Sequence, residues 1–141
     1  MRHQIKVRKL SRPKPHREAM LANLATSLFA DRTIQTTEAK AKEVKRIVDR
    51  LISTAKKDTL AARRQVARTI RNKEVFKKFF NQIVPQFKDR ESGFTRVLRV
   101  GYRRGDAAMM SMVELLTEKP KVDKEKEKAK KEKKEKKAKR K

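Results

Sequence analysis

The stretch of sequence that decides the fold is residues 36–55, TTEAKAKEVKRIVDRLISTA. Its large apolar side chains recur every three or four residues, which places them on one face of an α-helix. These side chains are Val44, Ile47, Val48, Leu51, Ile52 and Ala55. Thr36 or Thr37 is suited to cap the helix, and Glu38 places a negative charge in its first turn, where the helix dipole favours it. The pattern predicts an amphipathic helix that covers one face of a sheet.

The sequence before this helix predicts another helix and a short strand. Large apolar residues recur at helical spacing between about His16 and Ala30. They are Met20, Leu21, Leu24, Leu28 and Phe29. The β-like segment Thr33–Thr36 follows, and it is short enough to form one strand of a small sheet.

The sequence after the helix predicts two more helices and a hairpin. Asp58 and Asn72 are each suited to cap a helix, and Pro85 ends the second of the two or lies just beyond its end. From Phe94 to Tyr102 the chain is rich in β-branched and aromatic residues, and residues 107–116 resemble a returning strand. The segment between these two strands is Arg103-Arg104-Gly105-Asp106, which is typical of a turn.

These elements follow one another as helix, strand, three helices and two strands. We expect an α+β fold in two layers, with a small mixed three-stranded sheet packed on the helices. A chain of 141 residues is long enough for one such domain. We expect residues 18–116 to form that domain, residues 1–17 to form a basic arm, and residues 117–141 to form a disordered, low-complexity Lys/Glu-rich tail.

The charge of the chain indicates a polyanionic partner. Lys and Arg number 42 against 17 acids, which gives a formal net charge of +25 and a pI of about 10.9. Such a charge repels itself unless a polyanion balances it, so RNA, DNA and an anionic membrane surface are the candidates. The chain has no Cys and no apolar run of membrane-spanning length, and its first residues lack the apolar stretch of a signal peptide. We therefore expect it in the cytoplasm, or in an organelle of bacterial descent.

The basic arm is the strongest candidate for a binding site. Residues 1–17 carry seven Lys or Arg and no acid. The residues expected to contact RNA there are Arg2, His3, Lys6, Arg8, Lys9, Arg12, His16 and Arg17. Each Arg has a planar guanidinium that can hold two phosphate oxygens. The two histidines have no carboxylate or second His at metal-ligand spacing, so we expect hydrogen bonds to a phosphate or base instead.

Some basic residues of the body are candidates as well. Lys40 and Lys42 lie near the start of the second helix, and Thr95, Arg96, Arg99 and Arg103 lie on the short hairpin. We expect these six residues to contact RNA. Most of the other basic residues of the helices are expected to form solvated faces, and these are Lys45, Arg46, Arg50, Arg63, Arg64, Arg68 and Arg71.

The sequence offers little support for catalysis or for a cofactor. Its three glycines form no phosphate-cradling loop, and its acids are dispersed along the helices. We therefore predict no enzyme activity, no metal, no cofactor and no small-molecule substrate. With one Tyr and no Trp, the chain also has few platforms for stacking on single strands. Structured RNA recognised through its shape, phosphates and 2′-hydroxyls fits this composition better.

Many segments resemble one known family, the bacterial-type large-subunit ribosomal proteins numbered seventeen. The resemblance covers residues 1–116, in order and with similar spacing. The matching pieces are Met1-Arg2-His3, Arg8, Leu10, Arg12, His16-Arg17-x-Ala19-Met20, Asn23-Leu24-Ala25-x-Ser27-Leu28, Ile34-x-Thr36-Thr37, Lys40-Ala41-Lys42-Glu43, Leu51-Ile52-x-x-Ala55-Lys56, Gly93-Phe94-Thr95-Arg96, Gly101-Tyr102-Arg103-x-Gly105-Asp106 and Glu114-Leu115. The chain departs from the family pattern at Ile5-Lys6-Val7 and at Pro13-Lys14-Pro15, and the tail lies outside that pattern.

The resemblance implies a structural protein that binds 23S ribosomal RNA near the polypeptide exit side of the large subunit, beside neighbouring ribosomal proteins. It implies an RNA role for Arg2, His3, Arg8, Arg12, His16, Arg17 and Thr95-Arg96. It also implies the two-layer fold described above. Two other functions stay open from the residues alone: a nucleoid protein that binds DNA, and a peripheral membrane protein with basic amphipathic helices. An enzyme that acts on RNA is the weakest alternative.

Overall fold

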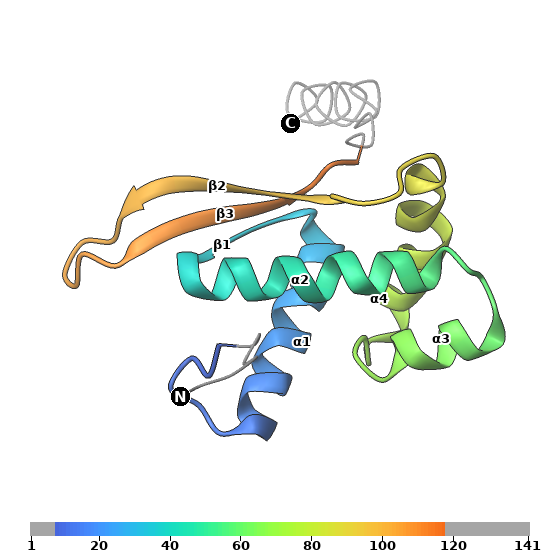
Figure 1. Cartoon of the computed structure of the whole chain (residues 1–141), viewed down its shortest axis with the longest axis horizontal. Helices are drawn as coiled ribbons and strands as arrows, with labels where there is room; N and C mark the ends of the chain where they lie inside the picture. The colour runs from blue at the N-terminus through green and yellow to red at the C-terminus, as the bar shows by residue number, and fades with distance from the viewer. Residues whose placement is uncertain (1–7, 118–141) are drawn as a thin grey trace, which may run out of the picture.

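The computed structural model describes residues 8–117, which form four α-helices and a three-stranded sheet (Figure 1). The elements in chain order are α1 (Lys14–Asp31), β1 (Thr33–Thr37), α2 (Glu38–Ala55), α3 (Leu60–Ala67), α4 (Lys73–Lys78), a π-helical turn (Phe79–Ile83), a 3₁₀ turn (Val84–Phe87), β2 (Thr95–Tyr102) and β3 (Met109–Leu115). This order confirms the predicted α+β class.

The sheet is antiparallel throughout, so the predicted mixed sheet was wrong. Its strand order is β1-β3-β2, and both pairings are antiparallel. Val113 in the middle of β3 lies opposite Ile34 of β1 and Val97 of β2. β1 and β2 run in the same direction, as expected for strands joined by a long helical connection. They do not pair, because β3 returns between them.

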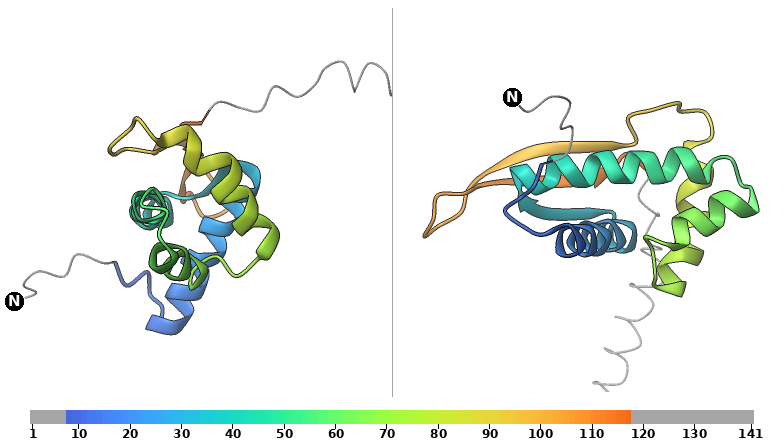
Figure 2. Two further views of the ribbon diagram at one scale, coloured as in Figure 1. Left: turned by 90° about the vertical axis from the view of Figure 1, so that its right-hand side faces the viewer. Right: turned by 60° about the horizontal axis from the view of Figure 1, so that its bottom comes forward.

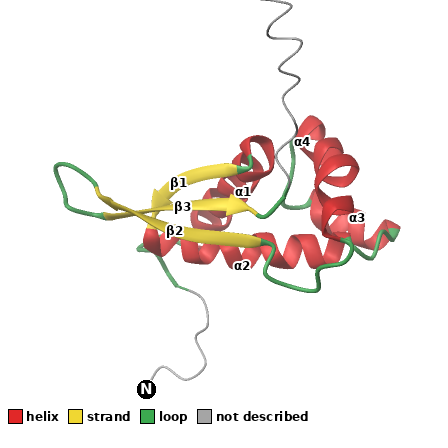
Figure 3. Ribbon diagram, turned by 90° about the horizontal axis from the view of Figure 1, so that it is seen from above, coloured by secondary structure: helices red, strands yellow, loops and turns green. Residues whose placement is uncertain are grey.

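The helices α1 and α2 pack on one face of the sheet and make the second layer (Figure 2). Figure 3 looks onto the other face, where the strands lie in front of both helices. Along β3 the side chains alternate accordingly, with Ser111, Val113 and Leu115 buried and Met110, Met112 and Glu114 partly exposed. The domain thus has one core, between the helices and one face of the sheet.

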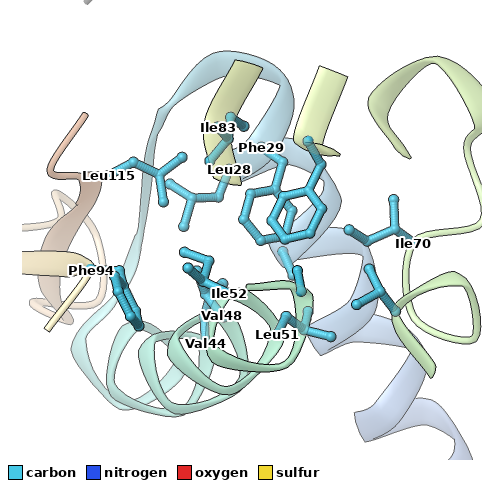
Figure 4. Close-up of a cluster of buried hydrophobic side chains, with 14 of the residues drawn as sticks. Leu28, Phe29, Val44, Val48, Leu51, Ile52, Ile70, Ile83, Phe94 and Leu115 are labelled. Carbon is cyan, nitrogen blue, oxygen red and sulfur yellow. The ribbon is translucent and has the colours of Figure 1, made fainter. Parts of the chain in front are cut away.

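The apolar face of α2 lies in the centre of that core (Figure 4). Val44, Val48, Ile52 and Ala55 are completely buried, together with Leu28 and Phe29 of α1 and Phe94 before β2. The predicted apolar stripe is therefore confirmed as the element that joins the layers. Thr37 occupies the cap position of α2, although its side chain accepts no hydrogen bond from the helix.

The helix α1 begins at Lys14, two residues before the predicted start at about His16. Pro13 precedes it in an extended conformation, and Pro15 lies in the first turn, where the missing N–H has no helical acceptor to lose. At the other end, Arg32 adopts a left-handed conformation with φ 67°, and its N–H donates to the carbonyl of Leu28. This sharp reversal leads the chain directly into β1.

Local polar groups begin the next two helices. Thr59, and not the predicted Asp58, caps α3, because its hydroxyl accepts a hydrogen bond from the N–H of Ala62. Asp58 has a positive φ of 46° and pairs with Arg63 instead. Asn72 caps α4 as predicted, with its side-chain oxygen accepting from the N–H groups of Glu74 and Val75.

The chain leaves α4 through irregular turns that bury aromatic rings. Val84 N–H donates to the carbonyl of Phe79, five residues earlier, and Pro85 follows in the 3₁₀ turn. The predicted helix is therefore α-helical only to Lys78 and continues as the π-helical turn to Ile83. Pro85, which has no N–H to continue an α-helix, lies two positions after that turn, in keeping with the prediction that it follows the helical segment. The wider turn places Phe79 in the core, where its ring centroid lies 4.4 Å from that of Phe29.

The hairpin of β2 and β3 extends beyond the helices (Figure 1). Along its outer part the apolar side chains of β2 are exposed, with Val100 at 57% and Tyr102 at 72%. The pairing register shifts between Arg99 and Gly101, so a β-bulge bends the strand there. The hairpin tip is therefore held by its own hydrogen bonds and side-chain pairs and not by the core.

Truncation of Ile52 tests the central position of α2. Ile52→Ala removes a fully buried side chain and should lower the free energy of unfolding by roughly 2–5 kcal/mol, the usual cost of lost burial plus a cavity. Leu60→Ala is the matched control, because Leu60 is 64% exposed, and it should cost less than about 0.5 kcal/mol. Urea unfolding followed by circular dichroism measures both. Equal losses would show that α2 does not organise the core.

Candidate nucleic-acid interface

The described part of the basic arm is anchored to α2 by one buried acid. Glu43 of α2 is only 4% exposed. Its carboxylate lies 3.8 Å from Nε of Arg8 and 3.7 Å from Nη1 of Arg46. Because a buried carboxylate needs a cationic partner, Glu43 draws both arginines toward this face of the helix. Glu43 was not predicted as part of the site, and the sequence hint was an acid within an otherwise basic helical face.

Between Arg8 and α1 the arm makes a compact turn. Leu10 and Ser11 both have positive φ, at 53° and 51°. The N–H of Arg12 donates to the carbonyl of Lys9, and Nη1 of Arg12 donates to the carbonyl of Leu10. This turn aims the chain from α2 to the start of α1, so that the basic groups of the arm lie beside a helix terminus.

Of the arm residues predicted to contact RNA, five lie in the described part of the chain and three lie outside it. Arg8, Lys9 and His16 are exposed, and Arg12 and Arg17 are partly exposed, so all five lie on the surface around the start of α1. His16 and Arg17 belong to α1 itself, which begins at Lys14. Arg2, His3 and Lys6 lie outside the described residues.

A second basic cluster forms where the start of α2 meets the hairpin. The carboxylate of Glu38 accepts hydrogen bonds from Nζ of Lys42 at 2.9 Å and from Nη2 of Arg99 at 3.0 Å. The hydrogen bond from Lys42, and then that from Arg99, lowers the pKa of Glu38 below its ordinary value. Lys40 lies in the same first turn of α2. The fold thus brings Arg99 to Lys42 through Glu38, which precedes Arg99 by 61 positions in the sequence.

Two further arginines of the hairpin, Arg96 and Arg103, also have acidic partners. Nη1 of Arg96 lies 3.3 Å from Oε1 of Glu114 on the neighbouring strand. At the tip, Arg103 donates to both oxygens of Asp106, at 3.0 and 2.6 Å. These hydrogen bonds, and a weaker one from the N–H of Ala108, lower the pKa of Asp106 to about 2. Both arginine side chains stay more than half exposed, so each is oriented by an acid and still open to solvent.

Thr95 has a structural position. Its side chain is 3% exposed and faces α2, and its hydroxyl donates to Oδ1 of Asp49 at 2.9 Å. The hydrogen bond ties the start of β2 to the central helix. Arg96, on the next position of the strand, faces the opposite way and is exposed. An RNA contact by the Thr95 side chain stays a prediction, and this burial gives it no support.

The candidate residues therefore form two groups that meet on α2 (Figure 1). One surrounds the start of α1 and reaches α2 through the Arg8–Glu43 pair, and the other lies along the start of α2 and the hairpin. Among residues 8–117 no three His, Cys, Asp or Glu side chains gather as metal ligands. Over the same residues no helix is long and apolar enough to cross a membrane.

Comparison with known proteins identifies a family that matches most of the chain. The profile of the family described as ribosomal protein L17 matches residues 20–116. A protein named large ribosomal subunit protein bL17 from Desulforamulus reducens is 52% identical over 101 residues, which cover 72% of this chain and 90% of that protein. Proteins of the same name from Carboxydothermus hydrogenoformans and Pelobacter propionicus are 50% and 47% identical over 108 and 118 residues. These two alignments cover 77% and 84% of this chain, and 96% and 93% of the respective relatives.

A pair of substitutions separates the roles of adjacent residues on β2. Thr95→Val keeps the shape of the side chain but removes the hydroxyl that binds Asp49, and it should lower the free energy of unfolding by about 1–2 kcal/mol. Arg96→Gln removes an exposed ion pair and should cost less than about 1 kcal/mol. Thermal unfolding compares the two variants. A stable Thr95→Val protein would show that the Asp49 hydrogen bond contributes nothing.

The stabilisation by the Asp106–Arg103 pair at the hairpin tip depends on pH. The folded pKa of Asp106, about 2, lies below the ordinary value of 3.8, so the stabilisation by this pair is complete above pH 3.8 and is lost as the pH falls toward 2. Arg103→Gln should raise the pKa of Asp106 toward 3.8, because Arg103 is the main cause of the shift. An NMR titration of the carboxyl carbon measures it. An unchanged pKa would assign the shift to the N–H of Ala108 instead.

Proposed function

The chain belongs to the ribosomal protein L17 family, and from this premise we propose that it is a structural constituent of the large ribosomal subunit that binds 23S ribosomal RNA. Its family relatives are named as proteins of the large subunit, so it is not an enzyme. Its place of action is the ribosome in the cytoplasm, where neighbouring large-subunit proteins surround it. The division into an arm (1–17), a body (18–116) and a tail (117–141) is part of this proposal.

The observation that carries the proposal is the exposure of arginines around the start of α1 and along the hairpin. A guanidinium presents several N–H donors in one plane, and an acid that binds one edge leaves the other edge free. Glu43, Glu114 and Asp106 hold Arg8, Arg96 and Arg103 in this way. The arginines are thereby oriented before RNA arrives, which reduces the entropy lost on binding.

The residues proposed to contact RNA in the described part are Arg8, Lys9, Arg12, His16, Arg17, Lys40, Lys42, Arg96, Arg99 and Arg103. Arg2, His3 and Lys6 extend the arm beyond that part. Contacts to phosphates position a protein on RNA, and 2′-hydroxyls let it distinguish RNA from DNA. The two groups of basic residues, one around the start of α1 and one along the start of α2 and the hairpin, suit a folded RNA that presents its backbone to an extended surface.

The arm should be required for assembly and not for folding. Changing Arg8, Arg12 and Arg17 together to Ala removes three exposed or partly exposed cations from the surface around the start of α1. Circular dichroism should show nearly unchanged helix content and unfolding temperature, because the buried Glu43 keeps Arg46 as a cationic partner when Arg8 is lost. Incorporation into large subunits should fall strongly, since charge-assisted contacts to phosphates are lost. Sedimentation of ribosomes from cells that express the tagged variant measures incorporation.

The same three positions changed to Lys provide the matched control. Lys keeps the positive charge but loses the planar fork, so only part of the incorporation should return. Full incorporation of the Ala variant would make the arm a passive segment and remove the central site assignment. Loss of folding in the Ala variant would place the arm within the core.

A further inference from the structure

A groove between three helices lies outside both regions described above. It is bounded by α1, α2 and α3, on the side of α2 away from the sheet (Figure 1), and encloses about 800 Å³. Its apolar lining includes Leu21 of α1 and Ile47 and Leu51 of α2. Figure 4 shows Leu51 on the side of α2 toward α1 and Ile70, away from Phe94 and the sheet. The groove follows from this packing, because α1 and α3 diverge below α2 (Figure 1). Ile47 is left partly exposed there, while Leu21 and Leu51 are buried.

Positive charge dominates the lining of this groove. Arg50 of α2 and Arg68 and Arg71 after α3 line it, with Glu18 as the one acid among the lining residues. Within residues 8–117 these three arginines have no ion pair, whereas Arg96, Arg99 and Arg103 on the hairpin each have one. All three are exposed. Their charges therefore stay uncompensated by the described protein, and a polyanion is the ligand that balances them.

The polar groups of the lining suit a sugar as well as a phosphate. Thr26 and Thr54 donate their hydroxyl protons to the carbonyls of Ala22 and Arg50 in their own helices, at 2.8 and 2.9 Å. Both threonines line the groove, and each hydroxyl oxygen keeps lone pairs that can accept a hydrogen bond. A ribose 2′-hydroxyl can donate to such an oxygen, while its ring carbons lie against the apolar floor.

We propose that this groove is a third RNA-binding region, which holds a segment of ribose-phosphate backbone with its phosphates on Arg50, Arg68 and Arg71. The proposal rests on the function proposed above and names a further surface for it. An acidic protein segment would also meet the arginines, but it has no hydroxyl donors at regular intervals for the threonine oxygens. RNA uses both features of the groove, and this combination favours it.

The contact can be tested in assembled ribosomes with the full chain. Gln65 is exposed and lines the groove, so a photo-reactive amino acid in its place reports what lies there. Lys9 in the arm is the reference position for the proposed function. After irradiation of purified large subunits, the Gln65 derivative should crosslink to ribosomal RNA. That crosslink should fall at least several-fold when Arg50, Arg68 and Arg71 are changed to Gln, while the Lys9 crosslink persists.

The outcomes separate the two proposals. A crosslink from position 65 to a protein would overturn the proposal that the groove binds RNA. The absence of a crosslink from position 65, while position 9 crosslinks to RNA, would overturn it as well. Both results leave the proposed function standing. If neither position crosslinks in subunits that contain the protein, both the groove and the arm assignment are wrong. Absence of the protein from large subunits overturns the proposed function itself.

Salt dependence of binding to purified ribosomal RNA gives a second measurement. Losing three phosphate contacts should reduce the slope of log affinity against log salt by about 2–3. The matched control changes Lys73, Lys77 and Lys88 to Gln, since these exposed residues carry the same total charge and do not line the groove. The control should change the slope clearly less. Equal slopes for the two triple variants would show that the groove arginines contribute only general positive charge, and this result would overturn the proposal.

Discussion

The burial of one face of α2 is the constraint on which the rest of this structure depends. The fully buried side chains of Val44, Val48 and Ile52 face the sheet and α1, and the neighbouring Leu51 faces α1 and α3. Every other element packs against this helix or against a neighbour of it. The polar residues of α2 gain fixed positions as a result. Glu38 meets the hairpin, Glu43 meets the arm, and Asp49 meets the start of β2.

Acidic side chains in this basic domain orient the arginine and lysine side chains next to them. With a net charge of +25, the chain has few acids, and several of those described hold an arginine or lysine in place. Such pairs at the surface add little to stability, because water and salt screen them. Their effect is on geometry, since they set the direction of side chains that would otherwise sample many rotamers. Within residues 8–117 the groove arginines Arg50, Arg68 and Arg71 have no such ion pair. An external anion is therefore needed to hold their side chains in one orientation.

Much of the fold could be predicted because it depends on short-range patterns. The 3.6-residue period of α2, the cap at Asn72 and the position of Pro85 are properties of adjacent residues, and all appear in the structure. The strand pairing was different. The mixed sheet was a reasonable expectation for strands joined by helices, but the insertion of β3 between β1 and β2 depends on contacts far apart in the chain.

The sequence by itself determined the fold class, the central helix, the basic character of the surface and the resemblance to a ribosomal family. These properties depend on composition and on patterns within a few turns of chain. Only the tertiary structure decided which charges are neighbours: that Arg99 shares Glu38 with Lys42, that Thr95 points into the protein, and that Arg50 lies across a groove from α1. The physical reason is that electrostatic interactions act through space, whereas the sequence orders residues only along the chain.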